Sequence, residues 1–129
     1  MTERVFIFYN LKPDVDRARF DERARSVERP LAESLEAIKR YSLTRFSRTE
    51  AGDAPPPFEY VEVLDVSSVK EYSAISSPAV DEFLAEWESD ITAYVMAYGA
   101  TVADTDTPVD ASIAGETDRR GGRGEDVNG

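Results

Sequence analysis

Val5-Phe6-Ile7-Phe8-Tyr9 is the stretch that decides the fold, because five apolar residues in succession predict a strand that is covered on both faces. A strand in a sheet that packs on one face only alternates apolar and polar residues. Residues 92–98 (TAYVMAY) predict a second strand of this kind, in which bulky and small side chains alternate. The sequence predicts only two helical regions to cover these strands. We therefore expect a homodimer, in which a second copy covers the face that the helices leave bare.

Four strands are expected in all, at positions 4–10, 38–48, 58–66 and 92–102. The segment 49–57 (TEAGDAPPP) is a loop, because consecutive prolines cannot join a ladder of hydrogen bonds. One helical region follows the first strand and another follows the third. This order predicts the ferredoxin-like fold, an α+β fold in which both helices pack on one face of a four-stranded antiparallel sheet.

Apolar residues at helical spacing define the two helical regions. The residues expected on the inward stripes are Phe20, Ala24, Val27 and Leu31 in the first region and Val80, Phe83, Leu84, Trp87 and Ile91 in the second. Asp14 or Asp16 is expected to cap the first helix, and Pro30 is expected to end or restart it. The second region is expected to be broken around Pro78.

Residues 1–102 are expected to form one folded domain, and residues 103–129 a disordered tail. The tail contains no aromatic residue and is rich in acidic residues and glycine. Such a segment cannot bury enough apolar surface to offset the entropy of the chain. No run approaches the roughly 20 apolar residues that span a bilayer, and no signal segment is visible. We therefore expect a soluble, cytoplasmic protein that does not bind membranes.

The composition excludes several classes of chemistry. The chain has no cysteine and no histidine, which rules out disulfides, thiolate catalysis, Ser-His-Asp hydrolysis, haem held by a proximal histidine and nearly all zinc sites. We expect neither a cofactor nor a metal. A net charge of −11 without a basic stripe argues against nucleic-acid binding. An acidic surface with few lysines is typical of salt-adapted (halophilic) proteins, and an arginine-rich coding bias is the alternative.

We assign the faces of the sheet by taking the smaller apolar residues to point toward the helices. The residues assigned to the helix-facing side are Val5, Ile7, Val61, Val63, Val95 and Ala97. The residues assigned to the opposite side are Phe6, Phe8, Asn10, Phe58, Tyr60, Glu62, Leu64, Tyr94, Met96 and Tyr98. The second strand is ambiguous. If Tyr41, Leu43 and Arg45 also lie on the opposite side, Arg45 could pair with Glu62.

These side chains predict a pocket for a small aromatic ligand between the paired sheets, because they combine apolar walls with a few orienting polar groups. The candidate catalytic residues are Glu62 and Arg45. Burial would raise the pKa of Glu62 and make it a general base, while Arg45 would stabilise developing negative charge. The candidate substrate-binding residues are Asn10, Tyr41, Tyr60, Tyr94, Met96 and Tyr98. The alternative is that the tyrosines simply fill the interface.

Several motifs in a fixed order resemble the RedY-like (HapK-like) family. They are Phe8–Asp16 (FYNLKPDVD), Phe20–Glu22 (FDE) with Ala24–Arg25 (AR), Tyr41–Arg45 (YSLTR), and Ala54–Val63 (APPPFEYVEV) followed by Asp65–Val66 (DV). The resemblance implies a dimeric α/β barrel and an association with secondary metabolism, in the biosynthesis of aromatic natural products. The chain departs from the family at Arg23, where relatives often have tryptophan. The family's substrate is therefore not carried over, and no catalytic set is transferred.

The favoured interpretation is a protein that handles a hydrophobic aromatic metabolite without a cofactor, by isomerisation, cyclisation or cofactor-free oxidation. The alternative is a non-catalytic dimeric carrier or accessory protein with a filled barrel. A cavity beside Glu62 that solvent can reach would favour the first interpretation, and a filled interior would favour the second.

Overall fold

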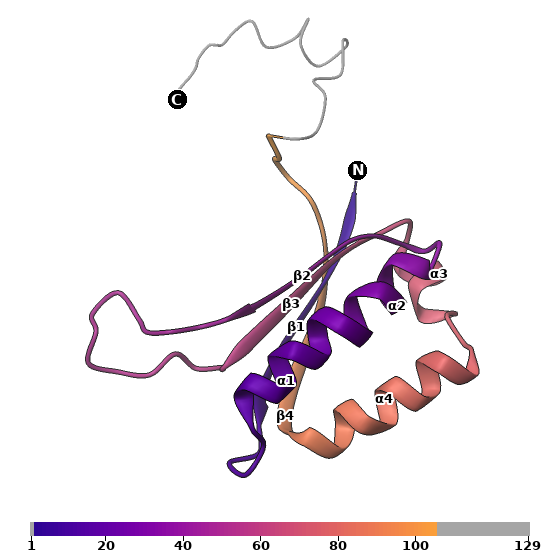
Figure 1. Ribbon diagram of the computed structural model, residues 1–129. Coiled ribbons are helices and arrows are strands. Elements are labelled where there is room, and N and C mark those ends of the chain that lie inside the picture. Colours follow the sequence, from indigo (N-terminus) through magenta and orange to yellow (C-terminus); the bar gives the residue numbers. More distant parts are fainter. Residues whose placement is uncertain (1, 106–129) are drawn as a thin grey trace, which may run out of the picture.

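Four antiparallel strands form one sheet in the computed structural model, which describes residues 2–105, and α1, α2 and α4 lie on one side of that sheet (Figure 1). The strands are β1 (Glu3–Leu11), β2 (Ile38–Arg45), β3 (Tyr60–Val66) and β4 (Ile91–Ala100). The helical segments are α1 (Arg17–Arg23), η1 (Ala24–Glu28), α2 (Arg29–Ser34), α3 (Val69–Ser73) and α4 (Pro78–Asp90). The order across the sheet is β2-β3-β1-β4. The predicted ferredoxin-like α+β fold is confirmed.

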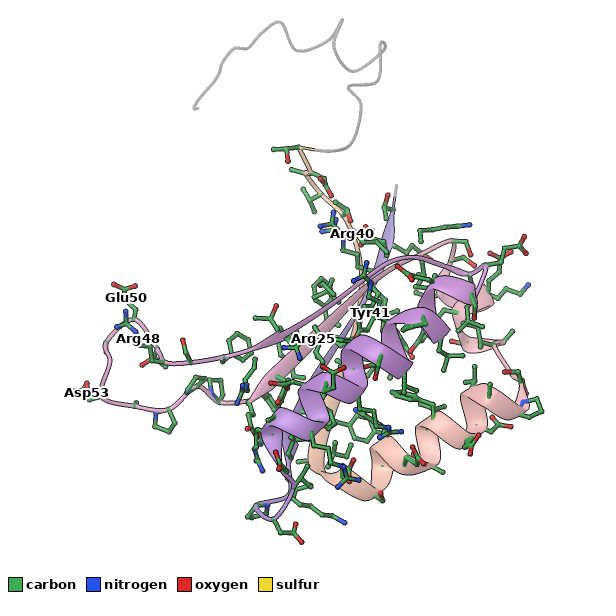
Figure 2. The ribbon with its side chains drawn as sticks, viewed as in Figure 1. Arg25, Arg40, Tyr41, Arg48, Glu50 and Asp53 are labelled. Carbon is green, nitrogen blue, oxygen red and sulfur yellow. The ribbon has the colours of Figure 1, made fainter. Side chains whose placement is uncertain are left out.

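The loop between β2 and β3, residues 46–59, extends well beyond the sheet (Figure 2). It carries Arg48, Glu50 and Asp53 toward its far end. Gly52 has a φ of 85°, a left-handed conformation that favours glycine at this turn. The predicted tail, residues 103–129, lies outside the described residues except for 103–105. In the described part of the chain, no helix is long and apolar enough to cross a membrane.

Short polar side chains begin the helices. Asp16, and not Asp14, caps α1, because its carboxylate accepts the backbone N–H of Arg19 at 3.1 Å. Ser68 and Ser77 cap α3 and α4 in the same way. The second helical region is therefore two separate helices, and the break before Pro78 agrees with the prediction.

The first helical region runs from residue 17 to residue 34 and contains a π turn, η1, in its middle. Pro30 has no N–H to donate to the carbonyl of Ser26, and its ring crowds that carbonyl. The backbone N–H of Arg29 instead donates to the carbonyl of Ala24, five residues back. Pro30 therefore interrupts the α-helical hydrogen bonding without ending the helical region.

The π turn changes which side chains point toward the sheet. The buried residues of this region are Phe20, Ala24, Glu28 and Ala32, each four positions after the last. Val27, which the sequence places on the inward stripe, is 45 % exposed, so that prediction is wrong. A π turn holds more residues than an α turn and therefore rotates the residues after it about the helix axis. Glu28 takes the buried position instead.

The register of the strands corrects the assigned faces. Tyr9 of β1 stands opposite Tyr60 of β3 and Tyr94 of β4, and directly opposite residues share a face. The helix-covered face therefore carries Val5, Ile7, Tyr9, Tyr41, Leu43, Arg45, Tyr60, Glu62, Leu64, Tyr94, Met96 and Tyr98. The bare face carries Phe6, Phe8, Asn10, Val61, Val63, Val95 and Ala97. The assignment of faces is right for β1 and wrong for β3 and β4. Larger and smaller side chains alternate along these strands, but the alternation does not reveal whether the larger or the smaller ones face the helices.

The core lies between the sheet and the helices and is built around Tyr9, which is fully buried. Its ring stacks on Tyr60, with centroids 5.4 Å apart, and meets the edge of Trp87 at 5.2 Å. Phe20 of α1 packs on Tyr60 at 5.2 Å. Bulky aromatic rings fill the wide space between a helical layer and a sheet, which explains why the larger set faces the helices.

The centre of the bare face is apolar, as the first stretch of sequence predicts. Phe6 and Phe8 of β1 lie on it beside Val61 and Val63 of β3. Val95 of β4 is half exposed there. The margin of the bare face is polar, with Arg40, Ser42 and Thr44 of β2 and the ion pair of Arg4 with Asp65. The helices α1, α2 and α4 lie on the other side of the sheet (Figure 1).

Candidate functional site

A cavity of about 340 Å³ lies between the helix-covered face of the sheet and the helices α2, α3 and α4. Its apolar lining consists mainly of Leu31, Leu35, Ile38, Leu64, Ile75, Val80, Phe83 and Leu84, with the phenols of Tyr72 and Tyr98. Two carboxyl groups, Glu28 and Glu62, also line it. An apolar pocket with a few polar groups is the usual form of a small-molecule site.

Glu62 lies in the middle of β3, between Ile7 of β1 and Leu43 of β2. It is 7 % exposed. A charged side chain in this position loses most of its hydration, which is costly unless other groups compensate. Its placement on an inner strand fixes it rigidly against the helices.

Glu28 reaches the same place from the helical layer, because the π turn ends at this residue and turns it inward. It is 6 % exposed. The hydroxyl of Tyr41, on β2, donates a hydrogen bond of 2.8 Å to Oε1 of Glu28. π turns occur frequently at functional sites, where they re-aim a side chain.

The carboxyl groups of Glu28 and Glu62 both line the cavity and lie close enough to share a hydrogen bond. Such a bond requires a proton on one of the two groups. Burial raises the pKa of both, and the charge of Glu28 raises the pKa of Glu62 further, well above its ordinary value. Glu28 accepts from Tyr41 and lies near the charge of Arg23, which favour its ionised form. Of the two groups, Glu62 therefore holds a proton more readily and Glu28 ionises more readily.

Replacing Glu62 by glutamine is expected to make the free energy of unfolding less dependent on pH. The pKa of Glu62 in the folded protein lies above its ordinary value of 4.5, so the folded state keeps a proton that the unfolded chain releases. This contribution to stability is complete below pH 4.5 and is lost as the pH rises through the raised pKa. One proton of difference changes the free energy of unfolding by about 1.4 kcal/mol per pH unit. Urea unfolding at pH 4.5 and 7.5 should show Glu62→Gln gaining stability relative to the wild type at the higher pH.

Glu59 supplies the opposite control. Its carboxylate pairs with Arg17 at 2.8 Å, and this hydrogen bond lowers the pKa of Glu59. Its contribution is therefore present above the ordinary pKa and is lost as the pH falls. Glu59→Gln should lose stability relative to the wild type at the higher pH. The same trend in both variants would show that the buried pair is not the source of the effect.

Tyr9 contributes a third buried polar group near the carboxyl pair. Its side chain is fully buried, and its hydroxyl has no hydrogen-bond partner among the described residues. Burial raises the pKa of Tyr9, and the charges of Glu28 and Glu62 raise it further. Its hydroxyl is therefore neutral and able both to donate and to accept a hydrogen bond.

The predicted pair between Arg45 and Glu62 does not form. The guanidinium of Arg45 pairs with Asp21 at 2.9 Å, and the hydroxyl of Tyr60 donates to the other oxygen of Asp21 at 2.6 Å. In the register of β2 and β3, Leu43 stands opposite Glu62 and Arg45 stands opposite Tyr60. The prediction is wrong because Arg45 lies two residues farther along its strand than the position that faces Glu62.

The other predicted binding residues are divided between the two faces. Asn10 lies on the bare face, where its side-chain oxygen accepts the N–H of Glu59 at 2.8 Å and so positions the end of the long loop. Tyr94, Met96 and Tyr98 lie on the helix-covered face of the edge strand β4, where all three are more than one-third exposed. Of these four, only Tyr98 lines the cavity of Glu62. Tyr60, Glu62 and the three β4 residues face the helices. They therefore do not line the pocket that the sequence predicts between two paired sheets.

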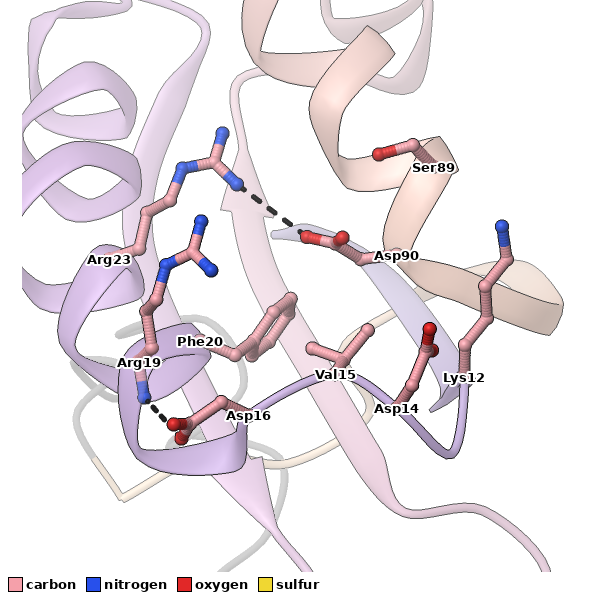
Figure 3. Close-up of a pocket in the computed structure, with 9 residues that line it drawn as sticks. All are labelled: Lys12, Asp14, Val15, Asp16, Arg19, Phe20, Arg23, Ser89 and Asp90. Atoms are coloured by element: carbon pink, nitrogen blue, oxygen red, sulfur yellow. Dashed lines mark hydrogen bonds and ion pairs between the residues drawn. The ribbon is translucent and has the colours of Figure 1, made fainter.

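A polar cavity of about 350 Å³ lies at the other end of the helices, between the start of α1 and the end of α4 (Figure 3). Its charged lining residues are Lys12, Asp14, Asp16, Arg19, Arg23 and Asp90. Arg23 faces Asp90 at 3.8 Å and also pairs with Glu86. Three positive and three negative side chains balance one another around this cavity, so we assign it no ligand.

Sequence reasoning missed Glu28, which the structure places beside Glu62. The available signal was Pro30, because a proline inside a helical pattern disturbs the hydrogen bonding of the preceding turn. That disturbance takes the form of a π turn here, and it moves the inward position from Val27 to Glu28.

A family model described as REDY-like protein HapK matches residues 3–102 of the chain. The crystal structure of HapK from Hahella chejuensis has a TM-score of 0.67 and 15% sequence identity, over 83% of this chain and 99% of that one. Hydroxynitrile lyase from Passiflora edulis has a TM-score of 0.63 and 16% identity, over 83% and 97% of the two chains. A dimeric ferredoxin-like protein of unknown function from Thermobifida fusca has a TM-score of 0.58 and 15% identity, over 78% and 92%. At these identities the structures show a shared fold. No curated protein matches the chain in sequence.

Proposed function

The chain belongs to the REDY-like protein HapK family, and we propose that its cavity binds a small hydrophobic molecule and catalyses proton transfer on it. The observation that carries the proposal is the carboxyl pair, Glu28 and Glu62, at the wall of an apolar cavity. Isomerisation and cyclisation of aromatic molecules both depend on moving a proton between carbon or heteroatom positions. These are the reactions that a carboxyl pair performs without a cofactor.

The two carboxyl groups have different roles in this proposal. Glu28 carries the negative charge and is the general base that removes a proton from the ligand. Glu62 holds the shared proton and is the general acid that returns one at a second position. Tyr41 holds Glu28 in place by its 2.8 Å hydrogen bond and limits the basicity of that carboxylate. Arg45, which pairs with Asp21, has no part in this step.

Apolar surroundings make such a base effective. A carboxylate in water is a weak base because hydration stabilises its charge, and burial removes that stabilisation. Leu64 and Phe83 lie on the walls of the same cavity and would pack against the body of the ligand. A positioned general base of this kind contributes about 10²–10⁴-fold to a rate.

The proposal is tested with 5-nitrobenzisoxazole, a small aromatic probe that opens when a base removes its C–H proton. In this step the N–O bond breaks as the proton leaves, and a nitrile and a coloured phenolate form. The wild type should accelerate the ring opening by about 10²-fold or more over the variant that carries both Glu28→Gln and Glu62→Gln. Absorbance of the phenolate at pH 7.5 gives the rate.

The matched control carries the same two substitutions, Glu82→Gln and Glu88→Gln, at exposed positions of α4, and removes at least as much negative charge. It should open the probe at the wild-type rate. A neutral apolar competitor, 4-phenylbutanol, should slow the wild type by occupying the cavity. If the wild type binds the competitor and is no faster than the double carboxyl variant, the chain is a carrier and not a proton-transfer catalyst.

We also propose that two copies pack with their bare sheet faces together. The support is the apolar character of that face, from Phe6 and Phe8 across to Val95, and the absence of a helix over it in residues 2–105. A structural relative from Thermobifida fusca is itself a dimeric ferredoxin-like protein. In such a dimer the cavity of Glu62 would lie outside the paired sheets, under the helices of each copy.

A further inference from the structure

We propose that the ligand of the Glu62 cavity carries a protonated nitrogen, which the Glu28–Glu62 pair binds as its counter-ion. This inference rests on the proposed function, because it names the class of molecule that the same cavity takes. The ligand would be a hydrophobic amine, amidine or imine in its cationic form. Its apolar body would occupy the space lined by Leu31, Leu64 and Phe83.

The first argument is that the Glu28–Glu62 pair holds a buried negative charge and that no arginine or lysine of the described chain forms an ion pair with it. Glu28 and Glu62 are 6 % and 7 % exposed, and one proton between them leaves one negative charge. Within residues 2–105, neither forms an ion pair with an arginine or a lysine. The guanidinium of Arg23 pairs instead with Glu86 and Asp90. A buried charge of this kind is stabilised strongly when an opposite charge reaches it.

The second argument is the position of the two carboxyl groups. Glu28 and Glu62 both line the cavity, so a cationic group of a ligand inside it can reach them. A hydrogen bond from a charged N–H group to a carboxylate is stronger than one between neutral groups.

The third argument is the aromatic part of the lining. Tyr72, Phe83 and Tyr98 all line the cavity, and the faces of aromatic rings attract cations. The ring of Phe83 already has the guanidinium of Arg23 at 5.4 Å from its centre. An anionic ligand, in contrast, would meet the charge of Glu28 in apolar surroundings and be repelled.

The test uses three probes of the same size that differ in charge: 4-phenylbutylamine, 4-phenylbutanol and 4-phenylbutyrate. Calorimetric titration of the wild type at pH 7.0 should show the amine binding about tenfold or more tighter than the alcohol, and the carboxylate binding weakest. Trp87, the single tryptophan of the chain, gives an independent fluorescence signal.

Variants test whether the preference for the amine comes from the Glu28–Glu62 pair or from the net negative charge of the protein. Glu28→Gln together with Glu62→Gln should bind the amine and the alcohol equally well. Glu82→Gln together with Glu88→Gln removes at least as much negative charge at exposed positions and should keep the tenfold preference.

The outcomes distinguish this inference from the proposed function. If the wild type binds the alcohol as tightly as the amine and opens 5-nitrobenzisoxazole, the inference is wrong and the proposed function stands. If neither the amine nor the alcohol binds, the proposed function fails and the inference fails with it. An amine preference that persists in the double carboxyl variant would also overturn the inference.

Discussion

Tyr9→Ala is expected to lower the free energy of unfolding by about 3–5 kcal/mol, the range measured for large aromatic residues that are truncated in a core. The ring of Tyr9 is fully buried and meets Tyr60, Trp87 and Phe20 at centroid distances of 5.4, 5.2 and 6.2 Å. Removing it leaves a cavity between the sheet and the helices that pack on it. Because domains of this size are stable by only about 5–15 kcal/mol, much of the population should be unfolded at mild denaturant concentrations.

Tyr9→Phe is the control for this prediction, because it keeps the ring and removes only the hydroxyl. That hydroxyl has no partner in the described chain, so its loss should be neutral or stabilising. Urea unfolding followed by Trp87 fluorescence compares the two variants with the wild type. Equal destabilisation by phenylalanine and alanine would mean that a hydrogen bond, and not the packing of the ring, holds this part of the core.

Val95→Asp is expected to convert the proposed sheet-to-sheet homodimer into folded monomers at micromolar concentration. Val95 lies on the bare face and is 50% exposed in one copy, so the aspartate should cost that copy little stability. In a sheet-to-sheet dimer the substitution places two charges in an apolar interface. The dissociation constant should rise by about a hundredfold or more. Sedimentation equilibrium in 0.15 M and in 2 M salt measures the change.

Val27→Asp is the matched control, because Val27 is similarly exposed at 45 % and lies in the helical layer. It should leave the dimer intact. Circular dichroism shows whether both variants keep the fold. A wild type that sediments as a monomer, or a Val95→Asp variant that dimerises as tightly as the wild type, would contradict the proposed sheet-to-sheet interface.

Two of the sequence-based predictions about the site differ from the structure for the same physical reason. The size of alternating side chains does not show which set faces the helices, because bulky residues suit a wide helix–sheet gap as well as an interface. Once Tyr9 is known to stand opposite Tyr60, the face of Glu62 follows, but that pairing joins residues far apart in the chain. The same register places Leu43 opposite Glu62 and sends Arg45 to Asp21.

The ferredoxin-like order of elements could be predicted from the sequence, because strand and helix periodicity, caps and prolines are local signals. The composition also limited the chemistry, since a chain without histidine or cysteine depends on carboxyl and phenol groups for proton transfer. The orientation of Glu62 toward the helices, and the π turn that brings Glu28 to it, became visible only in the folded chain. Strand register, which depends on contacts between distant parts of the chain, sets the position of Glu62. The π turn before Pro30 is local, but it brings Glu28 to Glu62 only because the helical region packs on that face of the sheet.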